Sequence, residues 1–313
     1  MEKIYNQIPI LDLNDFKSND KNIKQNFVNE LGQAYENIGF VAIRNHNLSE
    51  DLQDNLYKES KKFFYSEDSL KEQYNKVELA GQRGYIPKNK EIAKGASQVD
   101  MKEFYQLGQE SIQENIFPVE FPGFKNSTIE TFKTLEDTGK QMLSAIALHL
   151  GLNETHFDEM ANDGNSILRL LHYYPIEDTS MIKEGSVRAA EHGDINLITL
   201  LMGASADGLE VLRNDGEWIP VTVVEDAIVV NIGDMMERYT NGKLKSTIHR
   251  VVNPTDTKKL KESRFSVPFF FHPKLGTDLS CLECCIDDEH PKQFEDIDST
   301  TFLNERLAEI GLK

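Results

Sequence analysis

Apolar residues recur at helical spacing through much of the first half of the chain. In 22–37 and again in 49–74 they fall three or four positions apart, which predicts two amphipathic helices. Ser49 is a suitable N-cap for the second of these helices. Short β-type runs at 8–13 and 39–44 make this region mixed α and β. Further helices are expected over 127–150, 154–160 and, near the end of the chain, 300–310.

After residue 166 the pattern changes to brief runs of β-branched, aromatic and aliphatic residues. Turn signals such as Asn241-Gly242 separate these runs, and 233–239 is the one stretch among them with helical spacing. Many short antiparallel strands in one core are typical of a jelly roll. We therefore predict a mixed α and β fold with a jelly-roll (double-stranded β-helix) core, flanked by N-terminal helices and a C-terminal helix. The expected strands are 167–174, 195–201, 209–212, 227–232, 246–252 and 264–271.

The segment 79–124 is rich in Gly, Pro, Lys and Gln and predicts irregular chain with short strands. Long loops of this kind often border a binding site. Neither an internal repeat nor a low-complexity linker divides the sequence. We therefore expect an N-terminal region, 1–125, to pack on a jelly-roll region, 126–313, as one structural unit.

Composition narrows the possible partners. The chain of 313 residues carries 52 acidic and 34 basic residues, a net charge of −18, which disfavours nucleic acid and anionic membranes. No apolar run is long enough to cross a bilayer, and the N-terminus lacks the pattern of a signal peptide. We expect a cytoplasmic protein, and the sequence leaves its oligomeric state open.

Three cysteines lie close together near the C-terminus, at positions 281, 284 and 285. An odd number of cysteines is a poor disulfide framework and suits a reducing compartment. A zinc site with His290 is the alternative, but a second ligand pair at finger spacing is missing, so reduced structural thiols are favoured. Alternation of residues 279–286 predicts that these thiols lie on a strand.

His192-Gly193-Asp194 is the strongest candidate for chemistry. Residues two apart on a strand point to the same side, so His192 and Asp194 can reach one ion, and His249 in a later β run offers a third ligand. Alone, the tripeptide is more often a polar turn. Two imidazoles and one carboxylate that leave coordination positions open are diagnostic of non-haem Fe(II) oxygenases, and the combination favours a metal site.

Arg264 and Ser266 also lie two apart, on a strongly apolar β run. A guanidinium and a hydroxyl that face one pocket can bind a carboxylate through charge-assisted hydrogen bonds. Tyr174, at the end of another run, could add a phenol to the same anion, although alone it would more often be a core aromatic residue.

These residues and the sequence around them resemble the isopenicillin N synthase-like, 2-oxoglutarate-dependent Fe(II) dioxygenases. The resemblance covers nearly the whole chain and is carried by 191–201, 230–242, 246–254 and 264–270, with 8–13, 39–41 and 45–47 near the N-terminus.

The resemblance implies a role for each candidate residue. His192, Asp194 and His249 would bind Fe(II), Arg264 and Ser266 would hold the distal carboxylate of 2-oxoglutarate, and Tyr174 would assist co-substrate binding. The chain departs from plant relatives at His172, where they often have Asn, and in a Lys-rich insert, 257–261, which we expect to be a surface loop.

The implied activity consumes 2-oxoglutarate and O2, releases succinate and CO2, and hydroxylates, desaturates or cyclises a small molecule. Candidate substrate contacts lie in 84–87, 102–105 and 271–272. Two alternatives remain: an Fe(II) oxidase of the same fold that does not use 2-oxoglutarate, and a jelly-roll binding protein without catalysis.

Overall fold

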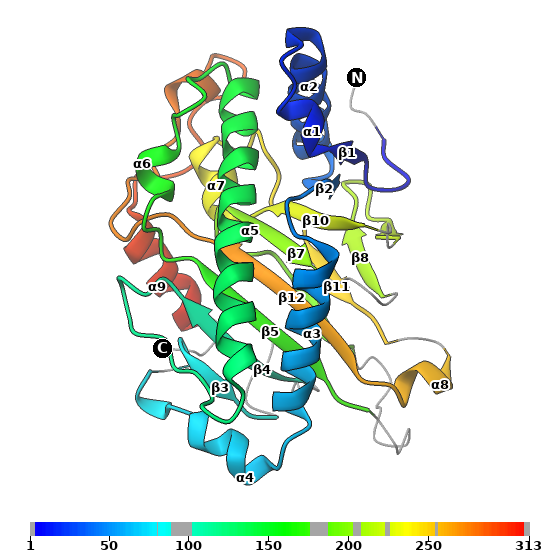
Figure 1. The fold of residues 1–313 in the computed structure, drawn as a ribbon. Helices are drawn as coiled ribbons and strands as arrows, with labels where there is room; N and C mark the ends of the chain where they lie inside the picture. The colour runs from blue at the N-terminus through cyan, green and yellow to red at the C-terminus, as the bar shows by residue number, and fades with distance from the viewer. Residues whose placement is uncertain are drawn as a thin grey trace.

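The computed structural model describes residues 4–79, 81–88, 102–175, 187–202, 208–222, 226–253 and 256–309. Two β-sheets form its centre, and long helices cover the outer face of the larger sheet (Figure 1). In the larger sheet the order is β1 (Ile10–Asp12), β2 (Phe40–Arg44), β10 (Ala227–Ile232), β7 (Ile198–Met202), β12 (Arg264–Phe271), β5 (Ile167–Tyr173), β4 (Glu103–Gly108) and β3 (Gly84–Ile86). In the smaller sheet it is β6 (Ala189–His192), β11 (His249–Val251), β8 (Leu209–Leu212) and β9 (Trp218–Pro220).

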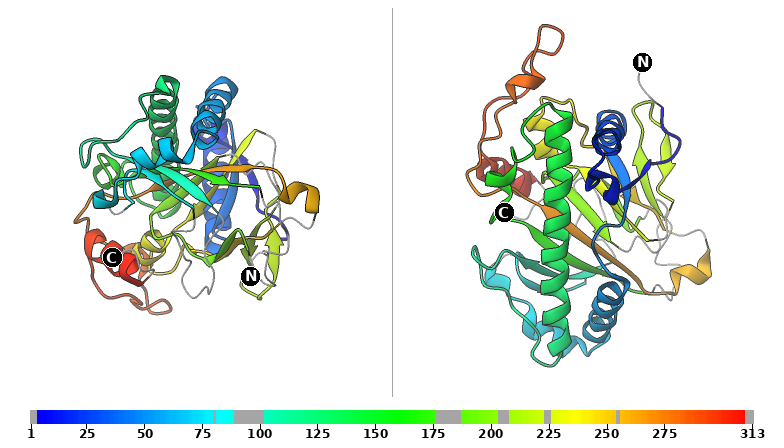
Figure 2. Two further views of the ribbon diagram at one scale, coloured as in Figure 1. Left: turned by 90° about the horizontal axis from the view of Figure 1, so that it is seen from below. Right: turned by 45° about the horizontal axis from the view of Figure 1, so that its top comes forward.

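Three helices form the outer layer, and Figure 2 shows them from two further sides. The long helix α5 (Pro122–His149) packs on β12 and β7, while α2 (Lys21–Asn37) and α3 (Glu50–Phe64) pack beside it. Gly139 allows the close approach of α5, because a Cβ at this position would lie 2.5 Å from the ring of Phe271. The remaining helices are short: α1 (Leu13–Phe16), α4 (Asp68–Lys71), α6 (Asp158–Ala161), α7 (Asp234–Tyr239), α8 (Thr257–Leu260) and α9 (Ser299–Glu309), with 3-10 turns η1 (Glu72–Tyr74), η2 (Val77–Leu79) and η4 (Glu283–Cys285).

Strands from both regions of the sequence share the larger sheet. β2, from the first 125 residues, pairs antiparallel with β10, and β4 pairs antiparallel with β5. Helix α5 also continues across residue 125. The jelly-roll core is therefore completed by the N-terminal region. No helix in the described ranges is long and apolar enough to span a membrane.

Several predicted elements are confirmed, and others differ at their ends. Ser49 caps α3 by accepting a hydrogen bond from the backbone N–H of Leu52 at 3.2 Å. The predicted helix 49–74 breaks after Phe64, where the Ser66 hydroxyl donates to the Phe63 carbonyl at 2.6 Å. The predicted helix 154–160 is reduced to α6, because the Asn153 side chain accepts from Thr155 N–H and forms a turn.

Two predictions near the C-terminus were wrong, one of a strand and one of a surface loop. The cysteines lie not on a strand but in a loop with the turn η4, which tertiary hydrogen bonds hold, including one from Leu282 N–H to the Tyr239 carbonyl. All three thiols are free. The Lys-rich insert forms α8 rather than a plain surface loop, because Asp256 accepts from Lys258 N–H and Leu260 is buried. Part of the predicted irregular segment 79–124, residues 80 and 89–101, lies outside the described residues.

Candidate active site

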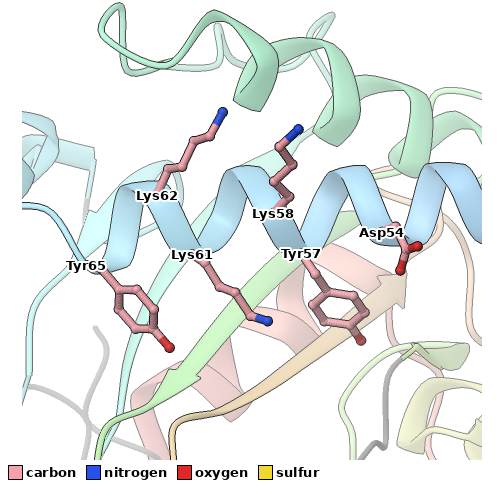
Figure 3. Close-up of a pocket in the computed structure, with 6 residues that line it drawn as sticks. All are labelled: Asp54, Tyr57, Lys58, Lys61, Lys62 and Tyr65. Atoms are coloured by element: carbon pink, nitrogen blue, oxygen red, sulfur yellow. The ribbon is translucent and has the colours of Figure 1, made fainter.

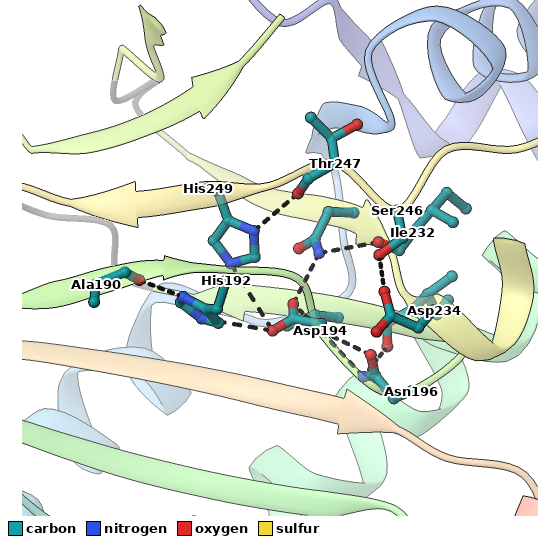
Figure 4. Close-up of polar contacts among 12 residues, drawn as sticks. Ala190, His192, Asp194, Asn196, Ile232, Asp234, Ser246, Thr247 and His249 are labelled. Atoms are coloured by element: carbon teal, nitrogen blue, oxygen red, sulfur yellow. Dashed lines mark hydrogen bonds and ion pairs between the residues drawn. The ribbon is translucent and has the colours of Figure 1, made fainter. Parts of the chain in front are cut away.

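The two histidines predicted as ligands face each other across neighbouring strands of the smaller sheet. His192 at the end of β6 pairs with His249 at the start of β11, and their ring centroids are 4.4 Å apart. Asp194 follows two residues later, where the Asp234 N–H donates to its backbone carbonyl at 2.7 Å. Figure 4 shows the three side chains turned toward one point.

Backbone carbonyls fix the orientation of both imidazoles. Nδ1 of His192 donates to the Ala190 carbonyl at 2.7 Å, and Nδ1 of His249 donates to the Thr247 carbonyl at 3.1 Å. Because a carbonyl only accepts, Nδ1 of each ring carries a proton, and Nε2 is the ring nitrogen left for another partner. Both Nε2 atoms point to Asp194 Oδ1, at 3.9 Å from His192 and 3.8 Å from His249.

Asp194 is held by its other carboxylate oxygen. Oδ2 accepts hydrogen bonds from Thr199 Oγ1 at 2.7 Å and from Asn231 Nδ2 at 2.8 Å. Burial alone would raise the pKa of Asp194, but the two neighbouring histidines and these hydrogen bonds bring it below its ordinary value. The carboxylate is therefore ionised, with Oδ1 left for another partner.

His192 is the most exposed of the three candidate ligands. Its side chain is 44% exposed, and protein atoms bury the rest of its surface. That burial, with the charge of His249 next in importance, lowers the pKa of His192 to about 4. The ring is neutral near pH 7, as a metal ligand must be.

The donor set fits Fe(II). His192, Asp194 and His249 each offer one ligand atom, and these atoms lie within 4.8 Å of one another. Two neutral imidazole nitrogens and one carboxylate oxygen on one side of an ion are the ligands of the facial triad. The hydrogen bonds at Nδ1 and Oδ2 are the outer contacts that orient such ligands.

Arg264 and Ser266 lie on β12, on the face of the larger sheet that is turned toward the smaller sheet. Both side chains are buried. Nε and Nη1 of Arg264 have no hydrogen-bond partner in the described part of the chain. A buried guanidinium without an acceptor is costly, so these orphaned donors fit a carboxylate such as the distal group of 2-oxoglutarate.

The structure does not bring Tyr174 to this anion site. Arg264 pairs in register with Tyr173, and its guanidinium lies over the Tyr173 ring at 5.1 Å. Tyr174 lies beyond the end of β5, with the Lys88 ammonium 5.2 Å from its ring centre. Of two adjacent tyrosines, Tyr173 therefore takes the place that we expected for Tyr174.

His172, one residue earlier, faces the opposite side of the sheet. Its Nδ1 donates to Glu103 at 2.7 Å, and its ring stacks on Phe265 at 4.7 Å. The departure from the plant pattern at this position therefore leaves the anion site untouched, because His172 does not enter it.

Strand alternation also divides the segments suggested to contact substrate. Ile86 and Phe104 pack in a small apolar cluster with Leu171 and Tyr173, on the inner face of the sheet. Phe271 instead points outward against Gly139 of α5. The inner members remain candidates for substrate contact.

Sequence reasoning missed four residues of this site. Thr199 and Asn231 hold Asp194, Tyr173 lies beside Arg264, and Arg188 reaches the same tyrosine ring at 5.7 Å. Asn231 left a signal, since it is a lone polar residue among Val and Ile in a β run. The others gave none that distinguishes them from ordinary strand residues.

A separate hollow of about 560 Å³ lies along α3. Figure 3 shows its lining, which consists of one aspartate, three lysines and two tyrosines: Asp54, Tyr57, Lys58, Lys61, Lys62 and Tyr65. It is an open groove on the helical layer, on the far side of the larger sheet from the three ligands. The chemistry of the molecule is concentrated between the sheets instead.

The fold and the donor set define a non-haem iron oxygenase with a jelly-roll core. Residues 164–273 match the model of the 2OG-Fe(II) oxygenase superfamily, and residues 8–122 match that of the non-haem dioxygenase in morphine synthesis N-terminal region. A 2-oxoglutarate-Fe(II) type oxidoreductase of Emericella nidulans is 30% identical over 304 residues, which cover 91% of this chain and 85% of the relative. The chain belongs to the 2-oxoglutarate/Fe(II)-dependent oxygenase family.

Solved structures agree with this membership. A putative 2OG-Fe(II) oxygenase family protein of Caulobacter crescentus has a TM-score of 0.87 and 39% identity, covering 97% of this chain and 99% of its own. A Neurospora crassa enzyme crystallised with α-ketoglutarate and thymine has a TM-score of 0.88 and 29% identity, covering 96% of each chain. The protein is thus an oxidoreductase that uses Fe(II), 2-oxoglutarate and O2.

Proposed function

We propose that His192, Asp194 and His249 bind Fe(II), and that Arg264 and Ser266 hold the distal carboxylate of 2-oxoglutarate during oxidation of a small molecule. The convergence of two Nε2 atoms on Asp194 Oδ1 carries this proposal. Tyr173 replaces Tyr174 as the aromatic residue beside the co-substrate.

The residues of the chain bind and orient, while the bound iron with 2-oxoglutarate and O2 supplies the oxidation of a C–H bond, with release of succinate and CO2. Thr199 and Asn231 keep Asp194 in one orientation, so that its free oxygen faces the ion. Arg264 fixes the far end of the co-substrate through the planar geometry of its guanidinium.

A small-molecule substrate suits the relatives. One relative, from Petromyces alliaceus, is named a proline hydroxylase, and the Neurospora structure holds thymine. We assign the enzyme to the cytoplasm, since its three cysteines are free thiols.

Iron stoichiometry tests the metal ligands. After anaerobic equilibrium dialysis with Fe(II), the parent should hold one ion per chain, and His249→Ala should hold almost none. His290→Ala, which removes an exposed histidine that bonds to Asp287, is the matched control and should bind as the parent does. Equal iron in all three proteins would show that the site is misplaced.

Succinate release separates the proposal from its alternatives. The 2-oxoglutarate-dependent enzyme forms succinate when 2-oxoglutarate, Fe(II) and O2 are present together. An oxidase of the same fold would bind iron and form none under any turnover condition, and a binding protein without catalysis would not bind iron.

A further inference from the structure

A second arginine shares the interior space with Arg264. Arg188 lies just before β6, and only 4% of its surface is exposed. Its guanidinium carbon is 5.7 Å from the centre of the Tyr173 ring, and that of Arg264 is 5.1 Å from the same ring. Two guanidinium groups, one next to each sheet, therefore gather around one tyrosine between the sheets.

No acidic side chain of the described residues forms an ion pair with either arginine. Burial is the main effect that lowers the pKa of Arg188, and the charge of Arg264 lowers it further. In the smaller sheet, by contrast, Arg250 pairs with two carboxylates, Glu191 and Glu210. Two buried cations side by side are unfavourable unless an anion joins them.

The anions of the proposed reaction neutralise only one of these arginines. Fe(II) carries two positive charges, Asp194 one negative charge, and 2-oxoglutarate two negative charges. The positive charge of Arg264 brings this set to zero. The positive charge of Arg188, a buried residue, is then left over, and a further negative charge would balance it.

We propose that Arg188 binds a carboxylate of the primary substrate, so that the enzyme oxidises an organic acid. This inference rests on the proposed function. The part of the substrate beyond its carboxylate would contact apolar side chains, because Ile86, Phe104 and Leu171 pack with Tyr173 on the same inner face of the sheet. A planar guanidinium suits a carboxylate, and the Tyr173 ring holds Arg188 in place.

The test compares acids with their neutral amides in protein that is loaded anaerobically with Fe(II) and 2-oxoglutarate. The probes are acetate, phenylacetate, acetamide and phenylacetamide at equal ionic strength, and the readout is thermal stabilisation. The acids should bind the parent at least about tenfold more tightly than the amides, and Arg188→Gln should abolish this preference. Arg250→Gln, an arginine paired on the outer side of the smaller sheet, should keep it.

Two further readouts identify what Arg188 does. The visible charge-transfer band reports whether 2-oxoglutarate stays bound, and its Kd in Arg188→Gln should remain within about threefold of the parent value, since Arg264 is intact. Without any ligand, Arg188→Gln should melt at a higher temperature than the parent, because it removes an unpaired buried charge.

Three results would overturn the proposal. In the first, the parent does not prefer acids to amides. In the second, Arg188→Gln keeps that preference. In the third, the Kd of 2-oxoglutarate in Arg188→Gln rises by an order of magnitude, which would make Arg188 a co-substrate ligand. If the parent gave no charge-transfer band at all, the proposed function itself would fail, which is a different outcome.

Discussion

His172 and Tyr173 are neighbours in β5, yet their side chains lie in two regions with opposite electrostatic designs. On the outer face, His172 and Lys71 both contact Glu103, a carboxylate with no exposed surface, at 2.7 and 2.8 Å. On the inner face, Tyr173 lies beside Arg264 and Arg188, which have no acidic partner in the described part of the chain.

This difference indicates that the outer face is a structural site and the inner face a ligand-binding site. The buried charge of Glu103 is balanced by the protein itself, with a further hydrogen bond from the Tyr85 hydroxyl. Arg264 and Arg188 on the inner face have no such partner among the described residues, and we expect them to bind anionic ligands. Substitutions on the outer face should therefore change stability, and substitutions on the inner face should change ligand binding.

The largest expected effect lies at the metal ligands. Asp194→Ala removes the one carboxylate among them, and succinate formation should fall by at least about a thousandfold, because the iron is lost. Its melting temperature should stay near that of the parent when neither protein holds iron. An assay of succinate with saturating Fe(II) checks the first expectation, and substantial remaining activity would remove Asp194 from the site.

Glu103→Gln should have the next largest effect, on stability alone. Removing the negative charge takes away the buried counter-ion of Lys71 and leaves it only the exposed Asp68, at 2.9 Å, which should cost about 3 kcal/mol in the free energy of unfolding. Urea denaturation at pH 7 measures this loss. The Kd of 2-oxoglutarate should not change, and weaker co-substrate binding in the folded variant would break the distinction between the two faces.

Arg264→Met should weaken the binding of 2-oxoglutarate without a loss of stability, which is the reverse of the effect of Glu103→Gln. The Kd of 2-oxoglutarate should rise by about thirtyfold to a hundredfold, because a charge-assisted pair is lost, while iron binding is maintained and the unfolding free energy of the unliganded protein does not fall. Anaerobic titration and urea denaturation are the two measurements. A marked loss of stability with unchanged affinity would place Arg264 among the structural residues.

Acid should remove the stabilisation that Glu103 provides on the outer face of the sheet, within a defined pH range. Burial would raise the pKa of Glu103, but hydrogen bonds from His172, Lys71 and Tyr85 outweigh it and lower the pKa to about 2. In the unfolded chain the pKa of a glutamate is about 4.3. The stabilisation is therefore fully present above that pH and is lost as the pH falls toward 2. The difference in unfolding free energy between the parent and Glu103→Gln should shrink over this range, and a constant difference would contradict the assignment.

The smallest effect concerns the two tyrosines. Tyr173→Leu should weaken 2-oxoglutarate binding by about fivefold, since it removes the aromatic ring beside the Arg264 guanidinium. Tyr174→Leu serves as its matched control and should leave the Kd unchanged. Titration of both variants decides the point, and the opposite result would restore Tyr174 as the co-substrate residue.

The sequence could indicate the candidate ligands because their geometry is local. His192 and Asp194 are two residues apart, as are Arg264 and Ser266, and alternation along a strand places each pair on one side. His249 could be recognised as a histidine in a β run. Its pairing with His192 across the smaller sheet came only from the structure.

Tyr173 and Arg188 could not be predicted, because each depends on contacts between distant segments. Two tyrosines follow one another at the end of β5, and only the register of β5 against β12 decides which one meets Arg264. Arg188 reaches Tyr173 because the two sheets close over the same space. Helix ends shifted for a similar reason, since local side-chain hydrogen bonds such as that of Ser66 stop a helix that apolar spacing alone would continue.

Anaerobic titration of 2-oxoglutarate into the Fe(II)-loaded parent, Arg264→Met and Glu103→Gln tests the central claim most directly. The visible charge-transfer band should appear in the parent and in Glu103→Gln at the same concentrations of 2-oxoglutarate. In Arg264→Met it should require far higher concentrations. Absence of the band in the iron-loaded parent, or equal affinities in all three proteins, would contradict the account.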